Sequence, residues 1–106
     1  MTQADGINLH GAVRGALIEN TYISNTGDDT YAQWGAELKP TNNTWTNNVA
    51  YNPGIVRPNW YGNCFATYGL MDVIFKNSVC YEPTLASPLV FADGHVKIDT
   101  TMFIFW

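Results

Sequence analysis

The sequence predicts an all-β protein, a parallel β-helix (solenoid) of about four coils, from three observations. Short strand-like segments recur at intervals of roughly 23 to 30 residues. No stretch of about 12 residues shows the periodicity of an amphipathic helix. Aromatic residues make up 14% of the chain and charged residues only 13%, which suits strands and turns. Repeats of this length that are built from strands indicate a solenoid, and residues 1–106 are expected to belong to one such domain.

The first strand-like segment of each repeat is a short run of alternating residues that ends in glycine. Its four copies are residues 7–11, 31–35, 65–69 and 90–94. Such alternation is typical of a strand with one buried face. Stacking these copies on one another predicts parallel pairing between successive repeats.

The second strand-like segment of each repeat contains asparagine or threonine at an equivalent position. Its copies are residues 18–23, 45–50, 75–80 and 98–103. We expect an inward-facing stack at the first position of each copy, formed by Ile18, Trp45, Phe75 and Ile98. Asn20, Asn47 and Asn77 either form a hydrogen-bonded ladder at an inner turn or are ordinary turn asparagines.

Two longer excursions interrupt the rhythm, at residues 37–44 and 53–63. Their prolines and glycines exclude a central strand there. Insertions in a solenoid usually emerge on one face, which is often the binding face. The second excursion carries Arg57, Trp60 and Tyr61, side chains that stack on ligands or donate hydrogen bonds to them.

The charge balance argues against nucleic acid or an anionic membrane surface as partner. The net charge is −4, and the five Lys and Arg residues are scattered singly. There is neither an apolar run of 18 residues nor a signal-peptide pattern. Because the chain ends on an uncapped apolar strand, we expect it to be a fragment of a longer protein. We also expect that protein to be secreted. We expect Cys64 and Cys80 to be buried free thiols, with a disulfide as the alternative.

Three carboxylates mark the candidate catalytic centre. Asp5 and Asp29 are 24 residues apart, and each lies two residues before a strand-like segment that also recurs after 24 residues. If the segments pair, the two aspartates stack about 4.8 Å apart, with Asp28 beside them. Such a cluster suits acid/base chemistry or a bound cation. Calcium and simple turn chemistry are the alternatives, and no other metal site or cofactor is expected.

The residues around these aspartates resemble the catalytic core of the mycodextranase and α-1,3-glucanase family of glycoside hydrolases. The resemblance is carried by Asp-Gly-Ile-Asn-Leu-His, by Ile-Glu-Asn-Thr-Tyr-Ile-Ser-Asn-Thr-Gly-Asp-Asp and by Ala-Gln-Trp, within residues 4–35. More distantly the chain is similar to dextranases and polygalacturonases. The resemblance implies a right-handed β-helix and an inverting mechanism, with Asp28 as general acid and Asp5 and Asp29 activating water. The polygalacturonase Gly-His-Gly and Arg-Ile-Lys signatures are absent, which favours a neutral glucan over an acidic one.

Further residues are candidates for substrate contacts. By strand alternation, either Gln33 or Trp34 is expected to face the groove. For His10 the alternative is the end of a strand, and for Trp34 it is a place in the core. The expected substrate-binding residues are His10, Gln33, Trp34, Arg57, Trp60 and Tyr61.

The sequence therefore predicts the core of an inverting endo-glycoside hydrolase that cleaves an α-glucan, either α-1,3-linked or of mixed linkage. The alternative is a non-catalytic carbohydrate-binding or structural β-helix repeat protein. A polysaccharide lyase is a third possibility, but Arg14 and Arg57 do not form a cluster of bases. Exposed strand edges predict that the isolated chain aggregates or is unfolded.

Overall fold

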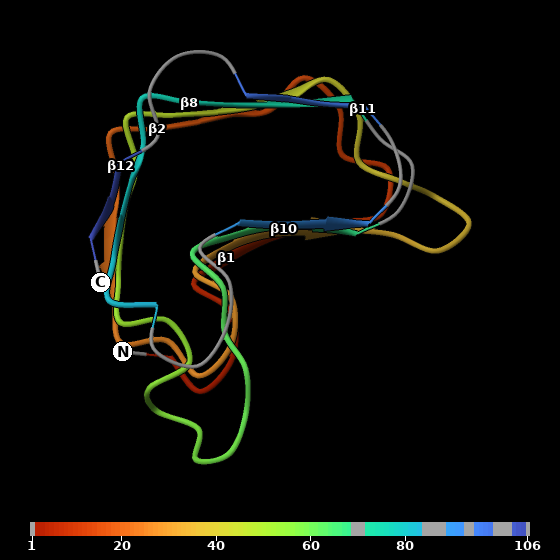
Figure 1. Ribbon diagram of the computed structural model, residues 1–106. Coiled ribbons are helices and arrows are strands. Elements are labelled where there is room, and N and C mark those ends of the chain that lie inside the picture. The colour runs from red at the N-terminus through yellow and green to blue at the C-terminus, as the bar shows by residue number, and fades with distance from the viewer. Residues whose placement is uncertain (1, 69–71, 84–88, 93–94, 99–102, 106) are drawn as a thin grey trace.

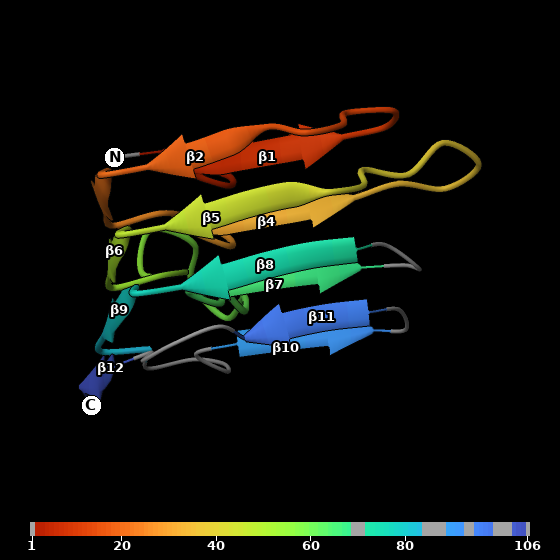
Figure 2. The ribbon, with the colours of Figure 1, turned by 90° about the horizontal axis from the view of Figure 1, so that it is seen from above.

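The computed structural model describes residues 2–68, 72–83, 89–92, 95–98 and 103–105. The regular structure within these ranges consists of short β-strands, so the expected all-β class is confirmed. Figure 1 shows the three sheets edge-on, so that the strands of each sheet lie behind one another. Figure 2, turned by 90°, shows how the strands of each sheet stack. None of the described segments is a helix long and apolar enough to span a membrane.

The first sheet contains β1 and β4, the strands that follow the candidate residues Asp5 and Asp29. Its strands pair in parallel in the order β1-β4-β7-β10. They are β1 (Ile7–His10), β4 (Tyr31–Trp34), β7 (Phe65–Tyr68) and β10 (Leu89–Ala92). Tyr31 and Phe65 turn inward and are buried, whereas Trp34 turns outward and is exposed.

The second sheet faces the first across the interior (Figure 1). Its order is β11-β8-β5-β2, again parallel. The strands are β2 (Leu17–Glu19), β5 (Asn43–Thr46), β8 (Asp72–Lys76) and β11 (His95–Ile98).

The third sheet closes one side, in the order β12-β9-β6-β3. Its strands are β3 (Tyr22–Ser24), β6 (Val49–Tyr51), β9 (Val79–Tyr81) and β12 (Phe103–Phe105). Each repeat therefore contributes one strand to each sheet, and the strand-like segment predicted over 18–23 divides into β2 and β3.

The predicted right-handed parallel β-helix of about four coils is corrected by this topology. The described strands form three separate four-stranded parallel sheets, and the fold is all-β on that basis. Repeats of this length predict parallel pairing between equivalent strands, and the pairing is present. Pairing alone does not define a continuous coil or its handedness, and connections at 69–71, 84–88, 93–94 and 99–102 lie outside the described residues.

The interior column is in the predicted register. Ile18 pairs with Trp45, Trp45 with Phe75, and Phe75 with Ile98. Trp45 and Phe75 are fully buried and stack with ring centroids 6.2 Å apart, while Ile18 packs against the core. The side chain of Ile98 lies outside the described residues.

The fourth repeat departs from the predicted alignment by one residue. Leu89, not Val90, pairs with Phe65, and Ile104, not Phe103, pairs with Cys80. The glycine-ending pattern placed Gly94 opposite Gly69, but those positions lie outside the described residues.

The asparagines Asn20, Asn47 and Asn77 are exposed residues at the corners between the second and third sheets. Each has a positive φ, between 48° and 56°. Asparagine tolerates this left-handed conformation better than most residues, which fits ordinary turn asparagines. At the next corner two stacked asparagines are hydrogen-bonded, where Asn52 Nδ2 donates to Asn25 Oδ1 at 3.4 Å.

Cys64 and Cys80 form a disulfide across the interior, so the expectation of two free thiols is wrong. Cys64 directly precedes β7 and Cys80 lies in β9, with Cα atoms 5.8 Å apart. A separation of 16 residues in the sequence gave no indication that the residue before β7 lies close to β9. Disulfides are typical of oxidising compartments, which is compatible with an extracellular protein.

Candidate active site

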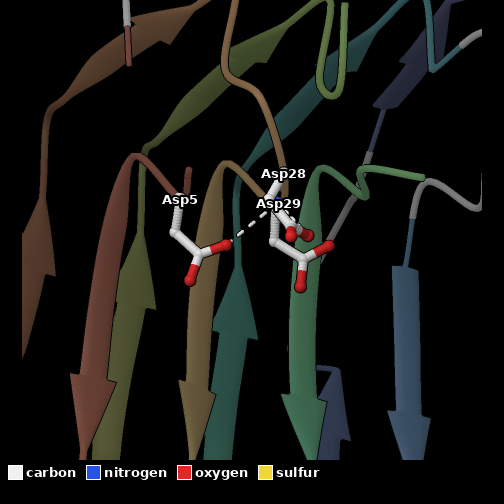
Figure 3. A group of neighbouring side chains, drawn as sticks. All are labelled: Asp5, Asp28 and Asp29. Carbon is white, nitrogen blue, oxygen red and sulfur yellow. Dashed lines mark hydrogen bonds between the residues drawn. The ribbon is translucent and has the colours of Figure 1, made fainter. Parts of the chain in front are cut away.

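The carboxylates of Asp5, Asp28 and Asp29 converge beside the first sheet. One oxygen of each lies within 4.8 Å of the others. Figure 3 shows the three side chains near the beginnings of β1 and β4, and Asp5 points toward the Asp28–Asp29 pair. The predicted gathering of Asp5 and Asp29, with Asp28 beside them, is therefore confirmed.

Strand pairing brings the aspartates together. Ile7 is in register with Tyr31, so Asp5 and Asp29, each two residues earlier, are neighbours. The Gly6 amide donates to the Asp29 carbonyl at 2.9 Å, which extends the pairing to the site. A Cβ at Gly6 would lie 2.5 Å from the Thr30 carbonyl oxygen, so this close approach requires glycine.

One backbone amide orients two of the carboxylates. The Asp29 N–H donates to Asp5 Oδ1 at 3.1 Å and to Asp28 Oδ1 at 3.0 Å. The Asn8 side-chain amide donates a hydrogen bond to Asp5 Oδ2 at 2.5 Å. Hydrogen-bond donors therefore fix the positions of the Asp5 and Asp28 carboxylates.

Asp29 is the most buried of the three, with 3% of its surface exposed. Its Oδ1 accepts hydrogen bonds from the Asn63 backbone N–H at 2.8 Å and from the Asn63 side-chain amide at 2.7 Å. Its Oδ2 accepts the Tyr68 hydroxyl at 2.9 Å. Three donors thus compensate for its removal from water.

The pKa values of Asp29 and Asp5 are both raised, chiefly because burial disfavours the charged form. The hydrogen bonds from Asn63 and Tyr68 oppose the rise at Asp29, and the charge of Asp28 adds to it. At Asp5 the Asn8 amide opposes the rise, while the charges of Asp28 and Asp29 add to it. Burial therefore makes both carboxylates better proton acceptors than an exposed aspartate.

Asp28 is held by the loop of residues 52–64. Its Oδ2 accepts the Trp60 indole N–H at 2.6 Å and lies 3.3 Å from Arg57 Nη1. The Arg57 guanidinium lies over the Trp60 ring, 4.3 Å from its centroid, and Trp60 stacks on Tyr61 with centroids 5.2 Å apart. Arg57 and Trp60 thus bind the candidate catalytic group itself instead of being free for a ligand.

The loop packs closely where it begins and ends. A Cβ at Gly62 would lie 2.5 Å from the Gly54 backbone and 2.7 Å from the Asp28 carbonyl oxygen. The Val56 amide donates to the Thr26 carbonyl at 3.2 Å. These contacts fix the base of the loop beside Asp28, and the excursion predicted at 53–63 does reach the candidate site.

An open pocket of about 260 Å³ lies over the three carboxylates. Trp34 and Tyr61 contribute exposed aromatic rings, with 42% and 47% of their surfaces accessible. The lining residues are Asp5, Asp28, Asp29, Ala32, Trp34, Tyr61 and Tyr68. Carboxylates beside exposed aromatic rings form a surface on which a sugar ring can stack while its oxygens meet proton donors and acceptors.

Of the remaining predicted binding residues, His10 lies beside the pocket and Gln33 does not face it. His10 is in register with Trp34, and their ring centroids are 4.0 Å apart. Gln33 is completely buried, and its Oε1 accepts the Trp45 indole N–H at 3.2 Å. The assignment of Gln33 to substrate binding is therefore wrong, because strand alternation turns it into the core and Trp34 toward the groove.

Sequence reasoning missed Asn63 and Tyr68. Phe65 is in register with Tyr31, so Asn63 occupies in the third repeat the place that Asp29 has in the second. Tyr68 is likewise in register with Trp34. Extending the aspartate column by one repeat would have found Asn63, but attention to carboxylates passed over an amide.

The three carboxylates are also the groups that could hold a hard cation such as calcium, which prefers oxygen ligands. Arg57 already provides positive charge to Asp28, and N–H or O–H donors occupy both oxygens of Asp29. A calcium ion would have to replace several of these contacts. No protein-family model, curated protein or solved structure matches the chain.

Proposed function

We propose that the protein is part of a glycoside hydrolase that cleaves a neutral α-glucan with inversion, by aspartate general acid/base catalysis. The observation that carries the proposal is the convergence of three carboxylates in an open groove with aromatic walls. Hydrolysis of a glycosidic bond needs one group that protonates the leaving oxygen and one that activates water. Because a disulfide persists in oxidising compartments, we propose that the protein acts outside the cell.

In this mechanism Asp5 and Asp29 bind and deprotonate the attacking water. Their raised pKa values suit them to accept its proton as it attacks the anomeric carbon. Asp28, after taking up a proton from solvent, donates it to the glycosidic oxygen as the bond breaks. Because the Trp60 indole N–H and the Arg57 guanidinium both donate to Asp28 Oδ2, the substrate must displace both donors before that oxygen can carry the proton for the leaving group.

The spacing of the carboxylates makes the stereochemical course a direct test. The nearest oxygens lie within 4.8 Å, whereas inverting pairs are typically about 6.5–9.5 Å apart. Proton NMR of the first product formed from an α-glucan reports its anomeric configuration. A β-configured first product supports inversion, and an α-configured one requires a retaining mechanism.

The roles are tested by three variants and two substrates. Asp28→Asn should abolish hydrolysis of the polymer but keep much of the rate on an aryl glycoside, whose leaving group needs little protonation. Asp5→Asn and Asp29→Asn should lose both activities by a factor of about 10²–10⁴, because the water is no longer activated. If Asp5→Asn alone spares the aryl glycoside, Asp5 is the acid. Near wild-type rates in all three variants would exclude the hydrolase.

A non-catalytic carbohydrate-binding protein is the second candidate. It is favoured by the exposed rings of Trp34 and Tyr61, which both line the same pocket. Binding without hydrolysis would give saturable affinity for an α-glucan that Trp34→Ala removes and Asp5→Asn leaves in place. Calorimetric titration with soluble oligosaccharides, followed by product analysis, separates the two functions.

A further inference from the structure

We propose that Asn63 and Tyr68 are positioning residues that keep Asp29 ionised and fixed as the water-activating base. This inference rests on the proposed function and identifies two residues that act through Asp29 rather than on the substrate. Its basis is the set of three hydrogen bonds from these two side chains and one backbone amide to a single buried carboxylate.

The direction of these hydrogen bonds favours the charged form of Asp29. The Asn63 side-chain amide donates both to Asp29 Oδ1 and, at 3.3 Å, to the Tyr68 hydroxyl oxygen. The Tyr68 hydroxyl is thereby left to donate its own proton to Asp29 Oδ2. A carboxylate that accepts three donors is stabilised relative to the protonated acid, even where burial opposes the charge.

The other charged and titratable groups around Asp29 do not provide this stabilisation. Asp5, before β1, and the adjacent Asp28 are carboxylates and repel a charge on Asp29. Tyr61 lies in the same pocket and carries no positive charge. Among the described residues the nearby cation is Arg57, and it is paired with Asp28. Neutral donors from Asn63 and Tyr68 therefore have to hold the charge.

The scaffold makes these donors rigid. Asn63 is 4% exposed and immediately precedes Cys64, which is bonded to Cys80 of β9. Its carbonyl accepts the Thr30 amide at 2.8 Å, within the pairing between β4 and β7. Tyr68 is the last residue of β7 and Asn63 lies two residues before the first, so the two donors flank the strand that pairs with β4, the strand following Asp29.

The experiment measures kcat/KM against pH for Tyr68→Phe and Asn63→Ala. Loss of a donor should require a higher pH to ionise Asp29, so each variant should lose about tenfold in kcat/KM on the acidic limb. The loss should diminish as the pH rises, with KM little changed. Tyr22→Phe is the matched control, because Tyr22 is an exposed tyrosine of β3 outside the site, and its profile should coincide with the wild type.

A substrate-free measurement separates this inference from the proposed function. Carboxyl ¹³C NMR of the full chain follows the titration of Asp29, assigned by its loss in Asp29→Asn. In Tyr68→Phe the midpoint should move to higher pH. An unchanged midpoint, or an equal loss of kcat/KM at every pH, would overturn the inference. If the wild type hydrolyses no glucan, the proposed function fails while the titration still decides the role of the donors. If Asn63→Ala does not fold, Tyr68→Phe alone decides.

Discussion

Asp28 and Asp29 are adjacent in the chain, yet different parts of the molecule hold their carboxylates. Asp29 is almost completely buried and is bound by Asn63 and Tyr68, residues attached to a central strand. Asp28, with 18% of its side chain exposed, is bound by Arg57 and Trp60 from the loop of residues 52–64. The donors to Asp29 lie just before β7 and at its end, whereas the donors to Asp28 lie in the middle of the loop that leads to that strand.

The difference shows how burial selects the partner of a carboxylate. A cation beside a buried group would itself have to be removed from water, at a cost of several kcal/mol. Neutral amide and hydroxyl donors stabilise Asp29 without that cost. Near the surface Arg57 keeps much of its hydration, 46% of its side chain being exposed, so an ion pair suffices for Asp28.

The largest expected effect concerns the sheet side of this comparison. Replacing Cys64 and Cys80 together by serine should lower the free energy of unfolding by about 3 kcal/mol, because the disulfide closes a loop of 16 residues. Urea denaturation of the oxidised wild type and the double variant measures the change. A difference below about 1 kcal/mol would mean that the sheets hold the start of β7 without the disulfide.

The pH dependence of stability should reflect the raised pKa values of Asp5 and Asp29. Between the ordinary value of 3.8 and these raised values the folded state binds more protons than the unfolded state, so stability falls as the pH rises through this range. Each group contributes a slope of at most about 1.4 kcal/mol per pH unit. Urea midpoints between pH 3.5 and 7 measure it, and Asp29→Asn should flatten the curve. A rise in stability with pH that disappears in Asp29→Asn would contradict the raised pKa.

The smallest effect is expected on the loop side. Arg57→Ala should change the free energy of unfolding by no more than about 0.5 kcal/mol, because an exposed ion pair contributes little. Asn63→Ala should cost about 2 kcal/mol, since it removes the side-chain donor from a buried carboxylate and leaves only the backbone N–H of that residue. Chemical denaturation of the two variants side by side tests the contrast. Equal costs would show that the exposed and the buried contacts hold the two aspartates equally firmly.

Much of the strand arrangement was predictable from the sequence. Ile18, Trp45 and Phe75 recur with the strand interval and do pack in one column, because equivalent positions of paired strands overlie. The same logic located the aspartates, whose spacing matches the interval between β1 and β4. A periodic pattern specifies which residues pair, and this is the part that the sequence could supply.

The remaining features depend on contacts between sheets, which no interval encodes. The disulfide joins β9 to the residue before β7, and a hydrogen bond that buried Gln33 accepts comes from the Trp45 indole across the interior. The strand interval places Asn63 and Tyr68 in register with Asp29 and Trp34, but their hydrogen bonds to Asp29 depend on how the side chains meet. The hydrogen bonds from the loop to Asp28 could not be predicted either, because the cationic Arg57 and the aromatic Trp60 would suit a ligand equally well.

The disulfide joins β9 to the residue before β7, and both belong to the same repeat. The disulfide therefore links two parts of one repeat, which forms one layer of the stack. It does not link that layer to its neighbours, which are connected to it by strand pairing, packing and the chain. Under a pulling force along the stack, the layers would peel apart at a force that is insensitive to reducing agents. A force applied across one layer would instead be resisted by a covalent bond, and in that direction reduction would weaken the protein.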